Sequence, residues 1–403
     1  MKLLAISHLF PNPEFPMFGV FVLRQLERLT ELGVEVRIIS PIPFTPRILA
    51  KANPKWQAYH NIPAYNQIGN IHILHPRYLR PPGRWFRPFS GASMYASILP
   101  VVKKLRTEFK FEAVLANSII PDGDAVLRLS QKFRVPGFCY AIGDDVLTHP
   151  HENFLTMRKT QSALQNLAGI ISHGNGLKAE INKLIGDASH VKTIYRGCNL
   201  SVFKPDREKR SVTRSRLGLT EDETLVLFTG YLQERKGIAE IMPAMSNLFQ
   251  RHACLRMLFV GENMMEQQVN EWLSNETVHK RVMLAGAQAH HDLPDFYNAA
   301  DIFILPSHWE GTPNALVEAA ACGLPIVSTK IPGAQEILGG EYENFLVCPH
   351  DSVALEKKIE ELTVSEKLRK EYGKIALSRV QSYFNAKENA KILRDFFFSR
   401  SSK

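Results

Sequence analysis

The chain contains one stretch that decides its fold, Ile302-Phe-Ile-Leu-Pro-Ser-His-Trp-Glu310-Gly-Thr-Pro-Asn314-Ala-Leu-Val-Glu318-Ala-Ala-Ala-Cys-Gly323-Leu-Pro-Ile-Val-Ser-Thr329. Its two apolar runs, 302–305 and 326–329, are typical of buried strands. Thr312 followed by Pro313 indicates a helix start, with a capping hydroxyl and then proline at the first helical position. Gly323, with a proline soon after it, indicates the end of that helix. The stretch therefore predicts a strand, a loop, a helix and a second strand.

Two carboxylates, Glu310 and Glu318, flank the start of this predicted helix. Open α/β sheets bind ligands at the carboxyl ends of their strands, where this loop lies. A helix N-terminus also favours an anion such as a phosphate. The pattern therefore predicts a ligand site, although two glutamates at this spacing alone are common on surface helices.

The same residues resemble the paired-glutamate motif of retaining GT-B glycosyltransferases, family 4 in particular. The resemblance extends over nearly the whole chain and includes Asp292-Leu-Pro-Asp-Phe-Tyr-Asn-Ala-Ala-Asp301, Cys322-Gly-Leu-Pro-Ile-Val, Pro332-Gly-Ala-Gln-Glu336-Ile and the junction-like Tyr195-Arg-Gly-Cys-Asn-Leu-Ser-Val-Phe203-Lys-Pro205. It is strongest toward the bacterial branch that builds teichuronic acid and other cell-surface polysaccharides. It implies an α/β GT-B fold, with two Rossmann-like domains facing a cleft.

Composition agrees with a soluble protein of two domains. The chain has 403 residues, 45% hydrophobic and 22% charged, which exceeds one ordinary core. No run reaches the roughly 18 apolar residues of a membrane span, and the N-terminal apolar run, soon broken by Pro11, fits a first strand better than a secretory signal. Five scattered cysteines indicate reduced thiols and a cytoplasmic location. The net charge of +9 suits anionic lipid or acidic sugars; no nucleic-acid motif accompanies it.

Strands and helices alternate along both halves of the chain, which predicts parallel sheets with helices on both faces. The proline-rich region 41–88 interrupts the first half and is predicted to be a long loop with short elements. The charged stretch 204–216 is predicted to be a linker. We therefore expect an acceptor-binding domain over 1–203, a nucleotide-sugar-binding domain over 204–380, and a C-terminal helix, 381–403, that returns to the first domain.

The segment Gly230-Tyr-Leu-Gln-Glu-Arg-Lys-Gly237 follows a predicted strand and precedes a helix. In a nucleotide-sugar reaction the diphosphate leaves with negative charge, and cations or helix starts placed there stabilise the transition state. The resemblance places Lys236 on the family's diphosphate-binding lysine. The family's arginine, however, falls on Tyr231, so Arg235 is a candidate to supply that charge. The alternative for Lys236 is a solvated lysine at a helix start.

The resemblance also implies the other donor contacts. Glu310 would face the transferred sugar, and Glu318 would accept hydrogen bonds from the ribose hydroxyls. Further donor-binding candidates are the backbone of Gly311, Thr312, Asn314 and Ala315 at the helix start, Gly286 and Ala287 near the base, and Gly19 near the diphosphate.

In the first domain, Ile142-Gly-Asp-Asp145-Val resembles the family's histidine-glycine-x-aspartate segment. Ile142 occupies the histidine position, which leaves a histidine contact to the sugar in doubt. Asp145 matches the aspartate and is a candidate to bind sugar hydroxyls. Its alternative is a capping aspartate.

A basic-aromatic segment lies further upstream and comprises Arg77, Arg80, Arg84, Trp85, Arg87 and Phe89. Cations with aromatic side chains suit an anionic membrane surface or an acidic sugar chain. A solvated loop with anchoring aromatic residues is the alternative.

The resemblance, with the residues that carry it, implies a retaining, metal-independent glycosyltransferase. Its donor would be a UDP- or GDP-linked sugar, used as a substrate with no cofactor, and its acceptor a glycan or a lipid-linked intermediate at the inner face of the membrane. A GT-B nucleotide-sugar epimerase shares the fold but fits the paired-glutamate stretch less well. The departures at Tyr231 and Ile142 keep open a catalytically weak sugar-nucleotide-binding subunit of an assembly complex.

Overall fold

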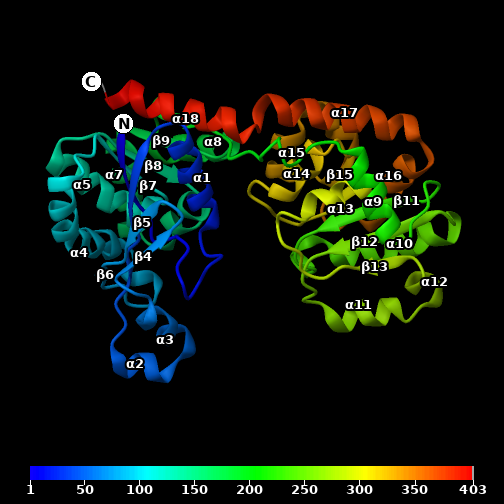
Figure 1. The fold of residues 1–403 in the computed structure, drawn as a ribbon, viewed down its shortest axis with the longest axis horizontal. Helices are drawn as coiled ribbons and strands as arrows, with labels where there is room; N and C mark the ends of the chain where they lie inside the picture. The colour runs from blue at the N-terminus through cyan, green and yellow to red at the C-terminus, as the bar shows by residue number, and fades with distance from the viewer. Residues whose placement is uncertain (402–403) are drawn as a thin grey trace. The chain divides into compact units, whose positions relative to one another are not determined.

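The computed structural model describes residues 1–401 and divides into two compact units (Figure 1). Unit 1 comprises Met1–Tyr195 with Lys387–Lys403, and unit 2 comprises Arg196–Ala386. The boundaries expected at 203 and 380 both fall inside unit 2. The first observed boundary lies in the junction-like segment that begins at Tyr195.

Unit 1 is built on an eight-stranded sheet in which the pairs are parallel except for β4 with β5. Its order is β10 (Val191–Thr193), β9 (Gly169–Ser172), β8 (Gly137–Ala141), β7 (Ala113–Ala116), β1 (Lys2–Ile6), β2 (Glu35–Ile39), β5 (Ile71–Leu74) and β4 (Tyr65–Ile68). Successive side chains of β1 enter two different cores, because Leu3 and Ala5 pack in one cluster and Leu4 and Ile6 in the other. The sheet is therefore covered on both faces, as parallel sheets are.

The helices of unit 1 follow its strands. They are α1 (Val20–Glu31), α4 (Arg87–Glu108), α5 (Asp124–Phe133), α6 (Asp144–Leu147), α7 (Phe154–Asn166) and α8 (Asn175–Ile185). The region 41–88 contains the short elements β3 (Ile42–Pro43), α2 (Arg47–Ala52), α3 (Pro54–Asn61) and β6 (Arg77–Tyr78) beside β4 and β5. The last helix, α18 (Ala386–Ser401), packs on this unit: the Phe397 and Phe138 ring centroids are 4.7 Å apart, and Arg400 donates to the Ala168 carbonyl at 2.9 Å.

Unit 2 is built on a six-stranded, wholly parallel sheet (Figure 1). Its order is β13 (Val282–Leu284), β12 (Leu255–Val260), β11 (Thr224–Thr229), β14 (Ile302–Leu305), β15 (Ile326–Thr329) and β16 (Leu346–Val347). Its helices are α9 (Arg207–Arg216), α10 (Ile238–Arg251), α11 (Glu266–Leu273), α12 (Glu276–His279), α13 (Leu293–Ala299), α14 (Asn314–Ala321), α15 (Pro332–Leu338), α16 (Ser352–Val364) and α17 (Glu366–Tyr383). This sheet has the strand order of a Rossmann-like domain, with a topological switch between β11 and β14.

The expected linker at 204–216 is wrong, because most of it forms α9. Asp206 caps the helix by accepting from the backbone of Glu208 and Lys209. Arg214 is 1% exposed and donates to Asp301 at 3.1 Å, while Arg210 donates to the other oxygen of the same carboxylate at 2.8 Å. The charges that suggested a solvated linker are thus used to hold a helix against its own unit.

Candidate functional site

Those predicted donor residues that belong to unit 2 lie at the carboxyl edge of its sheet, where the loops after β11 and β14 meet. Gly237 makes this meeting possible: its φ is 77°, and a Cβ there would lie 2.1 Å from the Pro306 carbonyl oxygen. The His308 N–H donates to the Arg235 carbonyl at 2.9 Å and joins the two loops. The edge is the one at which open α/β sheets bind ligands.

Lys236 and Glu310 form an ion pair in this place. The Lys236 ammonium donates to Glu310 Oε1, and the Ser307 hydroxyl donates to the same oxygen at 3.2 Å. The side chains of both charged residues are mostly buried, with exposed fractions of 16% and 12%. The sequence predicted both residues separately, and the structure brings them into direct contact.

Arg235 lies beside this pair. Its Nη1 is 4.0 Å from Glu310 Oε2 and donates to the Trp309 carbonyl at 3.3 Å. Tyr231, at the position of the family's arginine, is exposed. Arg235, Lys236 and Glu310, which we call the donor cluster, carry two positive charges and one negative charge. The donor cluster therefore has a net positive charge, and Arg235 is the residue that makes it positive; its contact with a diphosphate stays a prediction.

The loop after Glu310 leads into α14, but the predicted cap is wrong. The helix begins at Asn314 with Pro313 at the N-cap, and no side chain, Thr312 included, caps it. Gly311 packs tightly, because a Cβ on Gly333 of α15 would lie 1.9 Å from the Gly311 oxygen. The predicted amide donors of Gly311, Thr312, Asn314 and Ala315 lie in this loop and first turn.

Glu318 occupies the second turn of α14 and is 6% exposed. Its Oε1 lies 2.9 Å from His290 Nε2, and its Oε2 accepts from the Tyr297 hydroxyl at 3.0 Å. Burial, together with the neighbouring Glu318 carboxylate, holds the pKa of Tyr297 well above its usual range, so the phenol remains a donor. Sequence reasoning missed both partners, although Tyr297 lies in the quoted segment 292–301. The contact of Glu318 with a ribose diol stays a prediction.

Gly286 and Ala287 are exposed in the loop after β13. The Gly286 carbonyl accepts from the Gly261 N–H at 2.9 Å. A Cβ on Gly261 would lie 1.9 Å from the Gly230 oxygen, so the turns after β11, β12 and β13 are in close contact. The structure thus places these two residues on the same sheet edge as the donor cluster; their contact with a base stays a prediction.

The two candidates in unit 1 have structural roles. Gly19 is the N-cap of α1 at φ 69°, and a Cβ there would lie 2.4 Å from the Leu9 carbonyl, so glycine is required by the turn. Asp145 is 1% exposed and accepts from three backbone amides, those of Ile119 at 2.9 Å, Ile142 at 2.9 Å and Gly143 at 3.0 Å. Burial raises the pKa of Asp145 to about 6. Its carboxylate binds backbone amides without being the cap of α6, whose N-cap is Gly143 with no side-chain cap, and a contact between Asp145 and a sugar stays a prediction.

Across residues 1–401, no helix combines the length and apolar character needed to cross a membrane.

Residues 209–379 match the family model of glycosyl transferases group 1. The chain is 27% identical over 395 residues to the putative teichuronic acid biosynthesis glycosyltransferase TuaC of Bacillus subtilis, covering 98% of this chain and 97% of that protein. It is 25% identical over 232 residues to the UDP-Gal:alpha-D-GlcNAc-diphosphoundecaprenol alpha-1,3-galactosyltransferase of Escherichia coli, covering 57% and 59% of the two chains.

Solved structures show the same fold. The sucrose-phosphate synthase of Thermosynechococcus elongatus superposes with a TM-score of 0.74 at 19% identity, covering 99% of each chain. HepE of Anabaena in complex with UDP gives a TM-score of 0.72 at 18% identity, covering 99% of this chain and 100% of that one.

Proposed function

We propose that this chain, a group 1 glycosyltransferase with the GT-B fold, transfers a sugar from a UDP- or GDP-linked donor to a glycan or lipid-linked acceptor in cell-surface polysaccharide biosynthesis. The transfer retains the anomeric configuration and gives an α-linked product. The reaction needs no metal ion at the diphosphate.

The observation that carries this proposal is the donor cluster at the carboxyl edge of the unit 2 sheet. Lys236 and Arg235 converge on Glu310 immediately before the start of α14. Charge-assisted contacts in a mostly buried place are stronger than in water. Two cations and a helix start therefore offer the diphosphate what a metal ion would otherwise supply.

Each side chain has a distinct task in this proposal. Lys236 exchanges part of its contact with Glu310 for the diphosphate and stabilises the charge that develops as the sugar leaves. Glu310, held by Ser307, keeps the ammonium in place and faces the transferred sugar. Glu318 binds the ribose diol after the diol displaces His290, while Tyr297 keeps the carboxylate oriented. Arg235 adds the charge that Tyr231 does not provide.

The relatives support the choice of donor and acceptor class. HepE has been solved with UDP and with UDP-glucose, and the Escherichia coli relative is named for a UDP-sugar donor and a diphosphoundecaprenol-linked acceptor. TuaC is named for teichuronic acid biosynthesis. These names make a UDP-sugar and a lipid-linked acceptor the first substrates to test.

We also propose peripheral contact with an anionic membrane, where a lipid-linked acceptor would be found. Unit 1 exposes the aromatic and aliphatic side chains Trp85, Phe86, Phe89, Phe154 and Leu155, which we call the aromatic surface. Asn153 donates to the Arg84 carbonyl at 3.3 Å and so brings the 84–89 and 154–155 segments together. Exposed Arg80, Arg84 and Arg158 lie in or beside the same segments.

Two arginines of the basic-aromatic segment, Arg77 and Arg87, already have partners within the unit. Arg87 forms a two-pronged pair with Glu152, at 2.7 and 3.0 Å, and Arg77 donates to the carbonyls of Tyr59, His60 and Ile62. The variant that tests the membrane proposal is therefore R80A/R84A/R158A. Its binding to acidic liposomes should be lost, and wild-type binding should fall steeply with salt, since exposed charges are screened over about 8 Å at physiological ionic strength. If the wild-type chain does not bind acidic liposomes at low salt, the membrane proposal is wrong, whereas the transfer proposal is unaffected.

The transfer proposal is tested by incubating the chain with UDP- and GDP-sugars and a lipid-diphosphate-linked sugar, without added Mg²⁺ or Mn²⁺. The expected result is release of nucleoside diphosphate and an α-linked product by NMR. Nucleotide binding without product from any donor and acceptor pair would instead favour the sugar-nucleotide-binding subunit. Epimerised nucleotide sugar in the absence of acceptor would favour the epimerase.

A further inference from the structure

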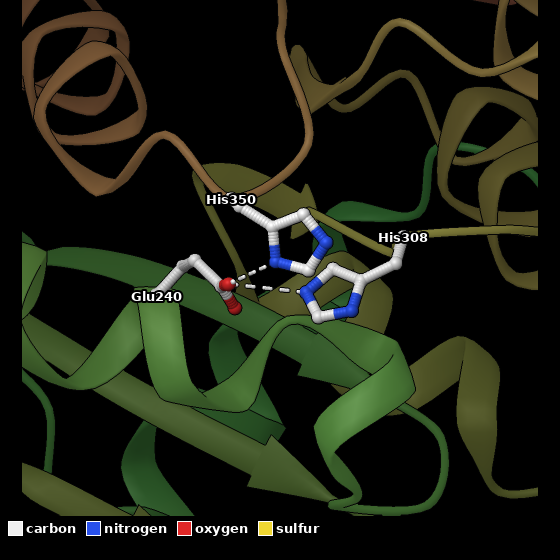
Figure 2. A group of neighbouring side chains, drawn as sticks. All are labelled: Glu240, His308 and His350. Atoms are coloured by element: carbon white, nitrogen blue, oxygen red, sulfur yellow. Dashed lines mark hydrogen bonds and ion pairs between the residues drawn. The ribbon is translucent and has the colours of Figure 1, made fainter.

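Three side chains that are far apart in the sequence meet beside the donor cluster: Glu240, His308 and His350 (Figure 2). Glu240 lies in the first turn of α10, His308 in the loop after β14, and His350 in the loop after β16. Glu240 Oε1 is 3.1 Å from His308 Nε2 and 3.1 Å from His350 Nδ1. All three residues belong to unit 2.

The hydrogen bonds of this group all converge on one oxygen. Both imidazoles turn a nitrogen toward Glu240 Oε1, and their ring centroids are 3.7 Å apart. The second oxygen, Glu240 Oε2, is buried and has no hydrogen-bond partner among the described residues. A buried carboxylate oxygen without a partner carries a desolvation cost.

The geometry is that of a metal-ligand set. Zinc binds imidazole nitrogen and carboxylate oxygen at about 2.0–2.2 Å in a tetrahedron, which places two ligand atoms about 3.3–3.5 Å apart. Here the two nitrogen-to-oxygen distances are 3.1 Å, and all three ligand atoms lie within 4.8 Å of one another. A small outward rotation of the side chains would admit the ion.

We propose that Glu240, His308 and His350 bind one divalent transition-metal ion, with Zn²⁺ as the favoured ion. Two imidazoles and one carboxylate suit zinc, whereas Ca²⁺ and Mg²⁺ take oxygen ligands. Three protein ligands leave a fourth position for water. The ion replaces the protons of the two ligating nitrogens, so both rings bind as neutral imidazoles.

The bound ion would fix the positions of the two loops that carry the donor cluster. His308 is two residues before Glu310, and its backbone N–H already bonds the Arg235 carbonyl at 2.9 Å. Glu240 is four residues after Lys236. The three ligands are separate from the groups proposed to contact the donor, so the ion positions the loops and takes no part in the transfer step. This consequence rests on the proposed function; the binding itself does not.

The test measures Zn²⁺ binding to the full chain without substrate. The exposed thiols of Cys254 and Cys348 are first replaced in C254S/C348S, because thiolates also bind zinc. This chain is stripped with EDTA and titrated with Zn²⁺ against a chromophoric chelator. We expect one ion per chain, and Co²⁺ in its place should give the visible absorption of a tetrahedral site.

Two variants remove ligands with little disturbance. E240Q keeps the shape of the side chain, and H350N suits a backbone φ of 65° that asparagine tolerates better than alanine. Each should weaken Zn²⁺ binding at least tenfold, since the loss of even an outer-shell partner costs about 10–100-fold. H252A is the matched control, because His252 also pairs with a glutamate, Glu360, at 2.8 Å, but this pair belongs to no candidate metal-ligand group among residues 1–401.

The proposal is overturned if the stripped chain takes up no Zn²⁺, or if E240Q and H350N bind it as tightly as H252A does. Because no nucleotide is present, either result leaves the glycosyltransferase proposal untouched.

Discussion

The carboxyl edges of the two sheets hold their carboxylates in different ways. In unit 2, Glu310 and Glu318 face side chains, the Lys236 ammonium and the His290 imidazole, that a ligand can displace. In unit 1, both oxygens of Asp145 are taken up by backbone amides, and the wholly buried Asp122 accepts from the backbone and ring of His8. The strand-end carboxylates Glu310 and Glu318 thus pair with charged or titratable side chains in unit 2, whereas Asp145 holds loop backbone in unit 1.

The largest effect on activity should come from replacing Lys236, the mostly buried cation of unit 2. K236A should lower the transfer rate at saturating donor by about a hundredfold or more, the usual cost of losing a charge aimed at a developing anion. Kinetic assays should show the defect in kcat, with unfolding unchanged by calorimetry. K280A, which removes an exposed lysine of the same unit, is the control. An unchanged transfer rate in K236A would mean that the carboxyl edge of the unit 2 sheet does not hold the reacting diphosphate through Lys236.

The second effect concerns the buried carboxylate of unit 1. Burial raises the folded-state pKa of Asp145 to about 6, above the unfolded value of about 3.9. The raised pKa of Asp145 therefore stabilises the folded chain fully below about pH 4, and this stabilisation is lost as the pH rises through about 6. A shift of about two units corresponds to about 3 kcal/mol at most.

Urea denaturation at several pH values measures this effect. The wild-type chain should gain stability relative to D145N as pH falls from 7.5 to 4.5, whereas D144N, at an exposed neighbour, should follow the wild type. If the difference in unfolding free energy between the wild type and D145N does not change with pH, the three backbone amides outweigh burial and keep Asp145 ionised.

A third effect separates ribose recognition from the chemical step. E318Q keeps an acceptor for Tyr297 but weakens the charge-assisted bonds to the diol, so the donor KM should rise about tenfold, since hydrogen bonds to charged groups contribute about 1.5–3 kcal/mol. The rate constant kcat should change little. E266Q, on exposed α11, should leave both constants unaltered. A loss confined to kcat would place Glu318 nearer the reacting atoms than we propose.

The smallest effect should come from Arg235. Its side chain is 47% exposed, and exposed ion pairs are worth at most about 1 kcal/mol. R235A should therefore weaken UDP binding about fivefold, with R235K restoring most of it. If R235A binds UDP as the wild type does, the charge missing at Tyr231 is not replaced from this position.

Much of the fold could be predicted from local sequence. The strands 302–305 and 326–329 have the predicted bounds, because short buried apolar runs between turn residues leave little ambiguity. Helix α9 could not be predicted, because its arginines are held by Asp301 and carbonyls some 85 residues or more away. Local charge gives no sign of such a partner.

The candidate site divides in the same way. The positions of Lys236, Glu310 and Glu318 at one sheet edge follow from the alternation of strands and helices. The direct pairing of Lys236 with Glu310, the partners His290 and Tyr297, and the grouping of Glu240 with two histidines depend on loops that meet only in the folded unit. The burial of Asp145 likewise depends on Ile119, from a different strand-end loop.

Isothermal titration calorimetry of the full chain with UDP tests the central claim most directly, because it measures whether the donor cluster binds a nucleoside diphosphate. The wild type and K280A should bind one UDP per chain with the same affinity, and K236A should bind it at least about tenfold more weakly, as expected for a lost charge-assisted contact. Equal binding of UDP by K236A and the wild type would contradict the account.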